Sequence, residues 1–211
     1  MGALVWRDVW RGYAGGGATL VVAFFLLVAV LFPFAIGPDA SLLARVGGGV
    51  VWAAALLAAL LPVERLVAPD LEAGVIDQLA VRGVSPVTIA AAKTVAHWLA
   101  FAPPLLLATI PAAALLNLSA ERLALVVAGL AIGTPGLAAL AVTTGALVAG
   151  LRGAGAVAGL VMLPLAVPLL IFGAGAIDGG AGGLKLLAAV SLLLTVGGPI
   201  VAGAAIRMGM E

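Results

Sequence analysis

The chain has 211 residues, of which 64% are hydrophobic and 9% are charged, with a formal net charge of +1. Soluble domains carry about 25% charged residues, so this composition indicates a protein that resides in the lipid bilayer. The near-neutral net charge gives no indication of nucleic-acid binding. The absence of cysteine excludes disulfides, thiol catalysis and CxxC metal sites. The length fits one membrane domain over residues 1–211, without a second soluble domain.

The first predicted element is a short amphipathic helix over residues 3–13. Trp6, Trp10 and Tyr13 recur at helical spacing, while the charged side chains take other faces. Trp and Tyr favour the headgroup region, so we expect this helix to lie flat on the membrane surface. An unstructured tail is the alternative. The glycines at 15–17 then let the chain turn into the bilayer.

Six long apolar stretches fill most of the remaining chain. A helix of about 20 apolar residues crosses the hydrocarbon core, so the sequence predicts an all-α integral membrane protein with six transmembrane helices. The predicted spans cover residues 18–36, 46–63, 86–116, 123–149, 156–177 and 184–206.

Local features refine these spans. Ser85, followed by proline, favours the start of the third span. Pro103 and Pro104 predict that this helix kinks or breaks. Gly129 and Gly133, four residues apart in the fourth span, permit a close approach between helices.

The sequence of a transporter usually contains the residues that couple it to its energy source. Ion-coupled carriers and pumps keep acidic residues at membrane depth, and no predicted span carries Asp or Glu near its centre. An ion-coupled carrier is therefore disfavoured. A nucleotide-binding Gly-x-x-x-x-Gly-Lys-Ser/Thr loop is also absent, because Ala92 rather than Gly precedes Lys93 and Thr94. ATP hydrolysis would have to come from a separate protein. We predict no catalytic residues and no metal site.

The basic residues predict the orientation of the chain. Lys and Arg collect on the cytoplasmic side of membrane proteins. With the N-terminus inside, the inner segments carry Arg7, Arg11, Arg65, Arg82, Arg152 and Arg207, with Lys93 near that face, and the outer loops carry Arg45, Arg122 and Lys185. This excess predicts that both termini are cytoplasmic.

The connector between the second and third spans, residues 64–82, is the most polar segment. It holds four of the nine acidic residues, and Leu71, Val75 and Leu79 form an apolar stripe in it. Pro69 suits a helix start, and Gly83 suits its end. The pattern predicts a helix of about 13 residues, roughly 20 Å long. It fits either a solvated loop or a coupling helix that binds a groove in a partner.

Short motifs give the chain a family resemblance. They are LFPFAIGP at 31–38, LLAR at 42–45, VERL at 63–66, AKTVAHW at 92–98, Gly-Thr-Pro at 133–135, LPL at 163–165 and PLLIF at 168–172, with Asp70, Gly74, Gln78 and Leu79 in the connector. In this order they resemble the heme exporter protein B family, CcmB, of the bacterial cytochrome c maturation system. That family belongs with the ABC-2-type permeases. Asp77 stands where we would expect Glu, which keeps the charge but shortens its reach.

The resemblance implies a non-catalytic ABC transporter subunit in the bacterial inner membrane, in two copies. It implies a CcmA-type ATPase as the separate motor, CcmC- and CcmD-type membrane partners, and delivery of heme to the chaperone CcmE. ATP hydrolysis would release the heme-loaded chaperone. Heme would be a transported ligand rather than a resident cofactor, and ATP would act only through the partner. Two alternatives are an ABC-2 permease for another hydrophobic substrate and a membrane scaffold for heme-delivery proteins.

Two sets of site residues follow from this resemblance. The residues expected to couple the chain to the ATPase are Glu64, Arg65, Asp70, Glu72 and Asp77. His97, the only histidine, lies four residues after Lys93 and so on the same helical face. One hypothesis is that His97 touches heme iron while Lys93 receives a propionate. The alternative is a packing histidine, with Lys93 extended to the headgroups.

Overall fold

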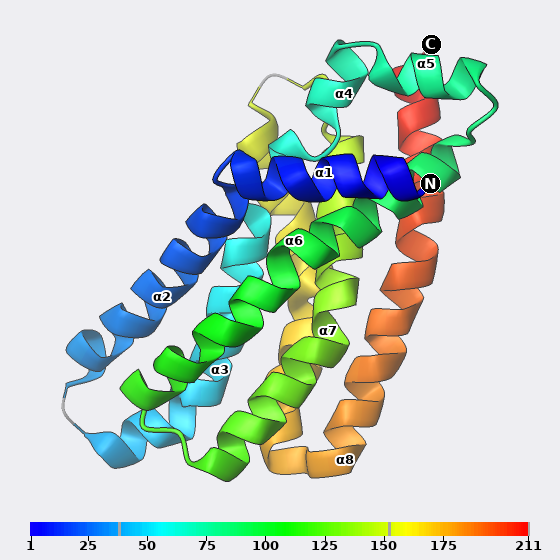
Figure 1. The fold of residues 1–211 in the computed structure, drawn as a ribbon. Coiled ribbons are helices and arrows are strands. Elements are labelled where there is room, and N and C mark those ends of the chain that lie inside the picture. The colour runs from blue at the N-terminus through cyan, green and yellow to red at the C-terminus, as the bar shows by residue number, and fades with distance from the viewer. Residues whose placement is uncertain (38, 152, 211) are drawn as a thin grey trace.

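The computed structural model describes every residue except 38, 152 and 211. Pro38 of the LFPFAIGP motif and Arg152 of the predicted charge bias therefore lie outside the described residues. The described chain is all helical (Figure 1). Its elements are α1 (Gly2–Ala14), α2 (Gly17–Ile36), α3 (Ala40–Leu60), the 3-10 turn η1 (Val63–Arg65), α4 (Ala68–Glu72), α5 (Val75–Val81), α6 (Pro86–Leu115), α7 (Ala120–Leu147) and α8 (Ala154–Gly209).

Five of the described helices are long and apolar enough to cross a membrane, and α8 is one of them. A straight helix of its 56 residues would be about 84 Å long, far more than the roughly 30 Å hydrocarbon core. Gly180 interrupts it with φ 52° and ψ −132°. Figure 1 shows that α8 has two limbs, joined by a turn, that run in opposite directions. The predicted spans 156–177 and 184–206 fall one in each limb. The six-span count itself stays a prediction.

The centre of the bundle is built around Trp52 of α3, which is only 1% exposed. Its indole lies against Gly129 and Gly133 of α7 and against Gly173 of α8, and a Cβ at Gly133 or Gly173 would overlap the ring. The sequence predicted that Gly129 and Gly133 permit a close approach between helices. In the structure, the space beside these glycines holds the indole of Trp52 from α3.

The helix α6 is continuous through Pro103 and Pro104. Of the predicted kink or break, the break does not occur. Pro103 has no N–H for the carbonyl of Leu99, one turn earlier, but the hydroxyl of Tyr13 in α1 donates to that carbonyl at 3.2 Å. A neighbouring helix thus bonds a carbonyl that the proline leaves free, which is how spanning helices tolerate proline. At the start of α6, the Ser85 side chain accepts a hydrogen bond from the backbone N–H of Thr88, as the sequence predicts for a helix cap.

The connector folds differently from the single helix predicted for it. It forms α4 and α5, separated by Gly74 in the left-handed conformation at φ 67°, which glycine adopts without steric cost. Ile76 is fully buried, and Leu71 and Leu79 pack beside it against residues near the end of α8. The predicted apolar stripe therefore packs partly on the chain itself.

The two ends of the molecule differ. Figure 1 shows the N-terminus, the C-terminus, α1, α4 and α5 together at one end, with α1 lying across α6. We call this the connector end. The loop between α6 and α7 and the turn of α8 lie at the opposite end (Figure 1). The predicted placement of both termini and the connector on one side agrees with this arrangement.

Candidate functional site

A cluster of charged side chains joins α1, α4 and α6 at the connector end. At its centre is Asp70, which is 3% exposed. Its carboxylate accepts hydrogen bonds from Lys93 Nζ at 2.5 Å, Arg7 Nη2 at 2.6 Å and Arg11 Nη1 at 2.8 Å. Asp8 completes the cluster, with Arg7 Nε at 2.8 Å and Lys93 Nζ at 3.3 Å. We call these five residues the Asp70 cluster.

Opposite charges shift the pKa values of Asp70 and Arg7 in the directions that favour their charged forms. Burial by itself raises the pKa of Asp70, but the hydrogen bond and charge of Lys93, followed by the contacts with Arg11 and Arg7, outweigh it and leave the pKa below its usual 3.8. For Arg7, burial acts to lower the pKa, but hydrogen bonding and charge from Asp8 and Asp70 raise it above its usual value. Asp70 and Arg7 therefore both carry their charges near neutral pH.

A cavity of about 300 Å³ lies beside the Asp70 cluster. Its lining comes from α1, the start of α2, the connector and α6. Along α6 the lining passes from Lys93 through His97 to Phe101, a distance of about 12 Å along the helix. Arg11 and Arg65 add charge to one part of the wall, and small apolar side chains such as Ala18 form another. The cavity is therefore amphipathic.

His97 lies in the wall of this cavity and is 7% exposed. Its Nε2 atom is buried and forms no hydrogen bond within the described chain. The imidazole stacks on Phe101, with ring centroids 5.5 Å apart and an angle of 18° between the planes. The structure thus brings His97 and Lys93 to the same cavity, as their spacing predicts. The ammonium group of Lys93 is bound by the carboxylates of Asp70 and Asp8.

The five predicted coupling residues do not form one surface. Glu64, Arg65, Glu72 and Asp77 are exposed at the connector end, whereas Asp70 is buried in its cluster. The side chain of Glu64 lies against Gly155 near the start of α8. Arg7, Asp8 and Arg11 were not predicted as site residues, because no local pattern links them to a residue about sixty positions later. Their only signal is the concentration of charge in a short amphipathic helix.

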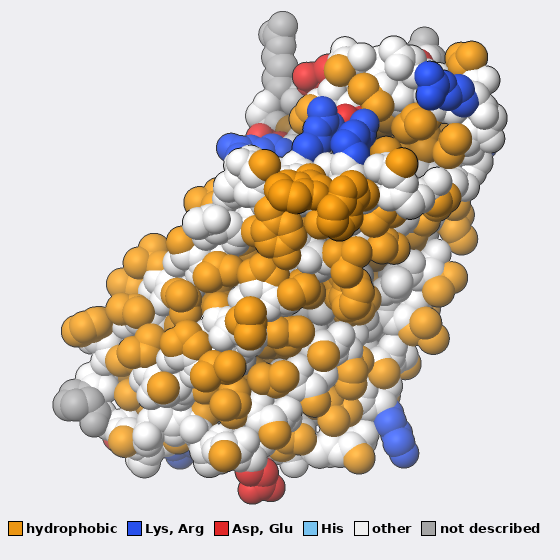
Figure 2. All heavy atoms as spheres, viewed as in Figure 1, with side chains coloured by type: hydrophobic (Ala, Val, Ile, Leu, Met, Phe, Trp, Pro, Cys, Tyr) orange, Lys and Arg blue, Asp and Glu red, His pale blue; other side chains and the backbone are white. Residues whose placement is uncertain are grey.

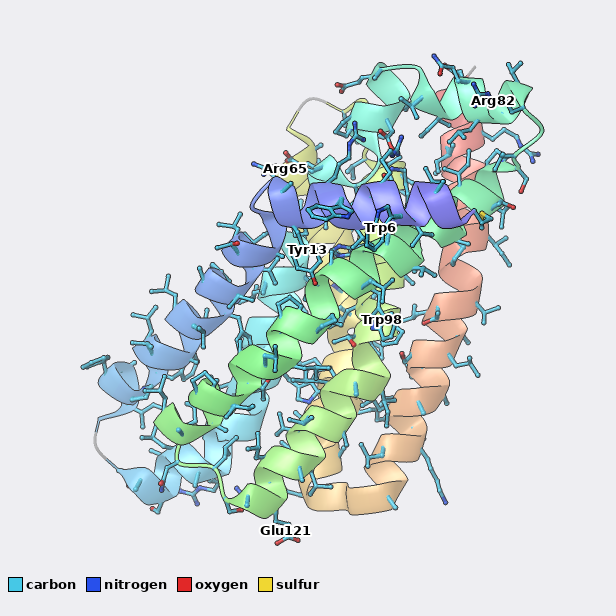
Figure 3. All side chains as sticks on the ribbon, viewed as in Figure 1. Trp6, Tyr13, Arg65, Arg82, Trp98 and Glu121 are labelled. Carbon is cyan, nitrogen blue, oxygen red and sulfur yellow. The ribbon has the colours of Figure 1, made fainter. Side chains whose placement is uncertain are left out.

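The surface divides into an apolar belt and charged ends. Figure 2 shows hydrophobic side chains over the middle of this face, with Lys, Arg, Asp and Glu gathered towards both ends. Trp6, Trp10 and Tyr13 of α1 are exposed. Figure 3 shows Trp6 and Tyr13 at the connector end, on the helix that crosses α6. These features define a multi-pass helical membrane protein with a cavity at its connector end.

Comparisons with known proteins identify the family. The family model described as CcmB protein matches residues 3–209. Heme exporter protein B of Paracoccus denitrificans is 40% identical over 218 residues, covering 100% of both chains. The protein of that name from Escherichia coli K12 is 36% identical over 194 residues, covering 89% of this chain and 88% of the relative. The chain belongs to the CcmB family.

Proposed function

We propose that this chain is the permease subunit of an ABC complex that handles heme during maturation of c-type cytochromes in the bacterial inner membrane. The observation that carries the proposal is the match to the CcmB family over residues 3–209. Relatives that are named heme exporter protein B and cover the whole chain support heme as the ligand. The sequence has no nucleotide-binding loop, so a CcmA-type ATPase would supply the energy. The other partners would be CcmC- and CcmD-type proteins and the chaperone CcmE, with two copies of this chain in the complex.

In this proposal the ATPase binds at the connector end. Glu64, Arg65, Glu72 and Asp77 are exposed there and would make the contact. Asp70 would act differently from its sequence expectation, because its carboxylate is already bound by cations of the chain itself. It would link α4 to α1 and α6, so that a displacement of the connector moves both helices. ATP hydrolysis would in this way drive release of the heme-loaded chaperone.

Charge reversal tests the coupling proposal. The variant Glu72→Lys with Asp77→Lys removes two exposed acids without touching the buried cluster. We expect roughly tenfold less ATPase to copurify with it, since repulsion at a binding surface costs affinity. Glu121→Lys is the matched control, because Glu121 is an exposed acid at the opposite end (Figure 3). Equal recovery of the ATPase with the wild type, the double variant and Glu121→Lys would contradict the assignment of the connector as the ATPase-binding surface.

The cavity supports a contact between heme and His97. An imidazole whose buried Nε2 atom has no partner within the described chain suits iron ligation. Lys93 is less suited to receive a propionate, because two carboxylates already bind its ammonium group. It would instead hold the Asp70 cluster in place beside the ligand.

A further inference from the structure

We propose that the cavity beside the Asp70 cluster binds an acidic amphiphile, with its anionic group on Arg65 and Arg11 and its apolar part against Phe101 and Ala18. The site is inferred from this chain's own residues. Two sources share the required chemistry: a porphyrin dicarboxylate and an acidic phospholipid. The porphyrin source rests on the proposed function, whereas the lipid source does not.

The charge around the cavity favours an anion. Asp8 and Asp70 are the two carboxylates in the lining. The Asp70 cluster supplies three cations to them, and Arg65 adds a fourth that forms no ion pair within the described chain. Of these cations, Arg11, Lys93 and Arg65 line the cavity, so three cations against two carboxylates leave a surplus of one positive charge in its wall. Arg11 is also well placed, since its side chain is 61% exposed while one of its nitrogens holds Asp70.

The position of the cavity favours an amphiphile over a small soluble anion. One wall belongs to α1, whose exposed Trp6, Trp10 and Tyr13 indicate the headgroup level. Figure 3 shows Trp6 and Tyr13 on this helix. The lining then continues along α6 to Phe101, about 12 Å further along the helix than Lys93. A ligand that fills the cavity therefore has a charged part at the interface and an apolar part in the bilayer.

His97 gives a second, independent indication of a ligand. It is more than nine-tenths buried, lines the cavity, and its Nε2 atom has no partner within the described chain. Buried polar atoms are normally hydrogen-bonded, and an unpaired one is unfavourable. A ligand atom in the cavity can pair with it, either a lipid oxygen or the iron of heme.

The test uses the full-length protein in a neutral detergent. The probes are metal-free protoporphyrin, hemin and phosphatidylglycerol, with phosphatidylcholine as the lipid that has no net charge. Absorbance and fluorescence report porphyrin binding, and native mass spectrometry reports lipid binding. Arg65→Gln is expected to weaken binding of the acidic probes about tenfold, because a charge-assisted hydrogen bond is lost. Arg82→Gln is the matched control: this exposed arginine lies at the same end (Figure 3) but does not line the cavity.

A second measurement does not depend on losing a charge. The chain has no cysteine, so Ala18→Cys places a single thiol in the cavity wall. A bound acidic probe should slow its reaction with a maleimide, whereas Ala120→Cys, exposed at the opposite end, should react at an unchanged rate. Equal affinities for Arg65→Gln and Arg82→Gln, together with no protection of Ala18→Cys, would overturn the proposal.

The probes also separate the two sources of ligand. Binding of both porphyrins supports the porphyrin source, and His97→Ala should then remove the imidazole-ligated spectrum of hemin without abolishing metal-free protoporphyrin binding. Binding of phosphatidylglycerol alone supports an acidic lipid and contradicts the porphyrin source. Neither result depends on ATPase recruitment, so failure of this site and failure of the coupling proposal are distinguishable.

Discussion

At the scale of single residues, Asp70 holds three cations from two other helices while almost fully buried. The net stability of such a pair is small, because burial costs each charge its hydration. Removal of one partner is costly, however, since the remaining charges stay where they are. Lys93 is the residue most affected, because its side chain is only 5% exposed.

We therefore predict that Asp70→Asn destabilises the protein by about 3 kcal/mol, the range typical of a broken buried ion pair. The measurement is the unfolding midpoint in detergent. Asp77→Asn, at an exposed position of the same connector, is the control and should leave the midpoint unchanged. A similar midpoint for both variants would show that the cluster contributes little.

The pH dependence of this contribution has a defined sign. The pKa of Asp70 is lower in the folded protein than the usual 3.8, so its stabilising effect is complete above that value. The effect is lost as the pH falls below 3.8 and passes through the folded-state pKa. The stability difference between the wild type and Asp70→Asn should therefore stay constant near neutral pH and shrink only in acid.

At the scale of helices, close packing depends on small residues that face one large side chain. Trp52 fills the space at Gly173 of α8, and interiors at native density do not absorb an added methyl group freely. A single turn of α8 thus contains two glycines with opposite roles, because nothing lies within 4 Å of a Cβ added at Gly175.

This contrast predicts that Gly173→Ala lowers stability by about 2 kcal/mol through overpacking. Gly175→Ala should be neutral or slightly stabilising, because alanine is the better helix former. Thermal unfolding of the two variants in one detergent makes the comparison. If Gly175→Ala lowered the stability as much as Gly173→Ala, the cause would be a general effect of alanine on α8 rather than a clash with the indole of Trp52.

The sequence predicted the elements better than their contacts. Local hydropathy and aromatic spacing predicted α1 over 3–13 and placed most spans within a few residues of the observed helices, because these signals belong to the elements themselves. The unbroken α6 was not predictable in this way, since the group that bonds its freed carbonyl is Tyr13, 86 positions from Leu99. The Asp70 cluster was missed for the same reason, and His97 was placed correctly because helical spacing alone puts it beside Lys93.

At the scale of the whole molecule, both termini and the connector share one end (Figure 1). The predicted charge bias assigns that end to the cytoplasm. The ATPase proposal requires this orientation, because ATP is available on that side only.

Accessibility of single cysteines tests the orientation. In whole cells, a membrane-impermeant maleimide should label Glu121→Cys at the opposite end and leave Glu72→Cys in the connector unlabelled until the cells are opened. Both positions are exposed, so burial does not explain a difference. Labelling of Glu72→Cys in intact cells would reverse the orientation and remove the basis for a cytoplasmic ATPase contact.

The early position of α1 in the chain has a consequence for biosynthesis. Its Asp8 pairs with Lys93, 85 residues later, and at about 5–20 residues per second the ribosome needs roughly 4–17 seconds to make that stretch. During this delay α1 has emerged but its binding partners on α4 and α6 do not yet exist. Trp6, Trp10 and Tyr13 would hold the nascent helix at the lipid surface during this delay. The charged residues of α1 can then bind Asp70 and Lys93 once α6 has been inserted.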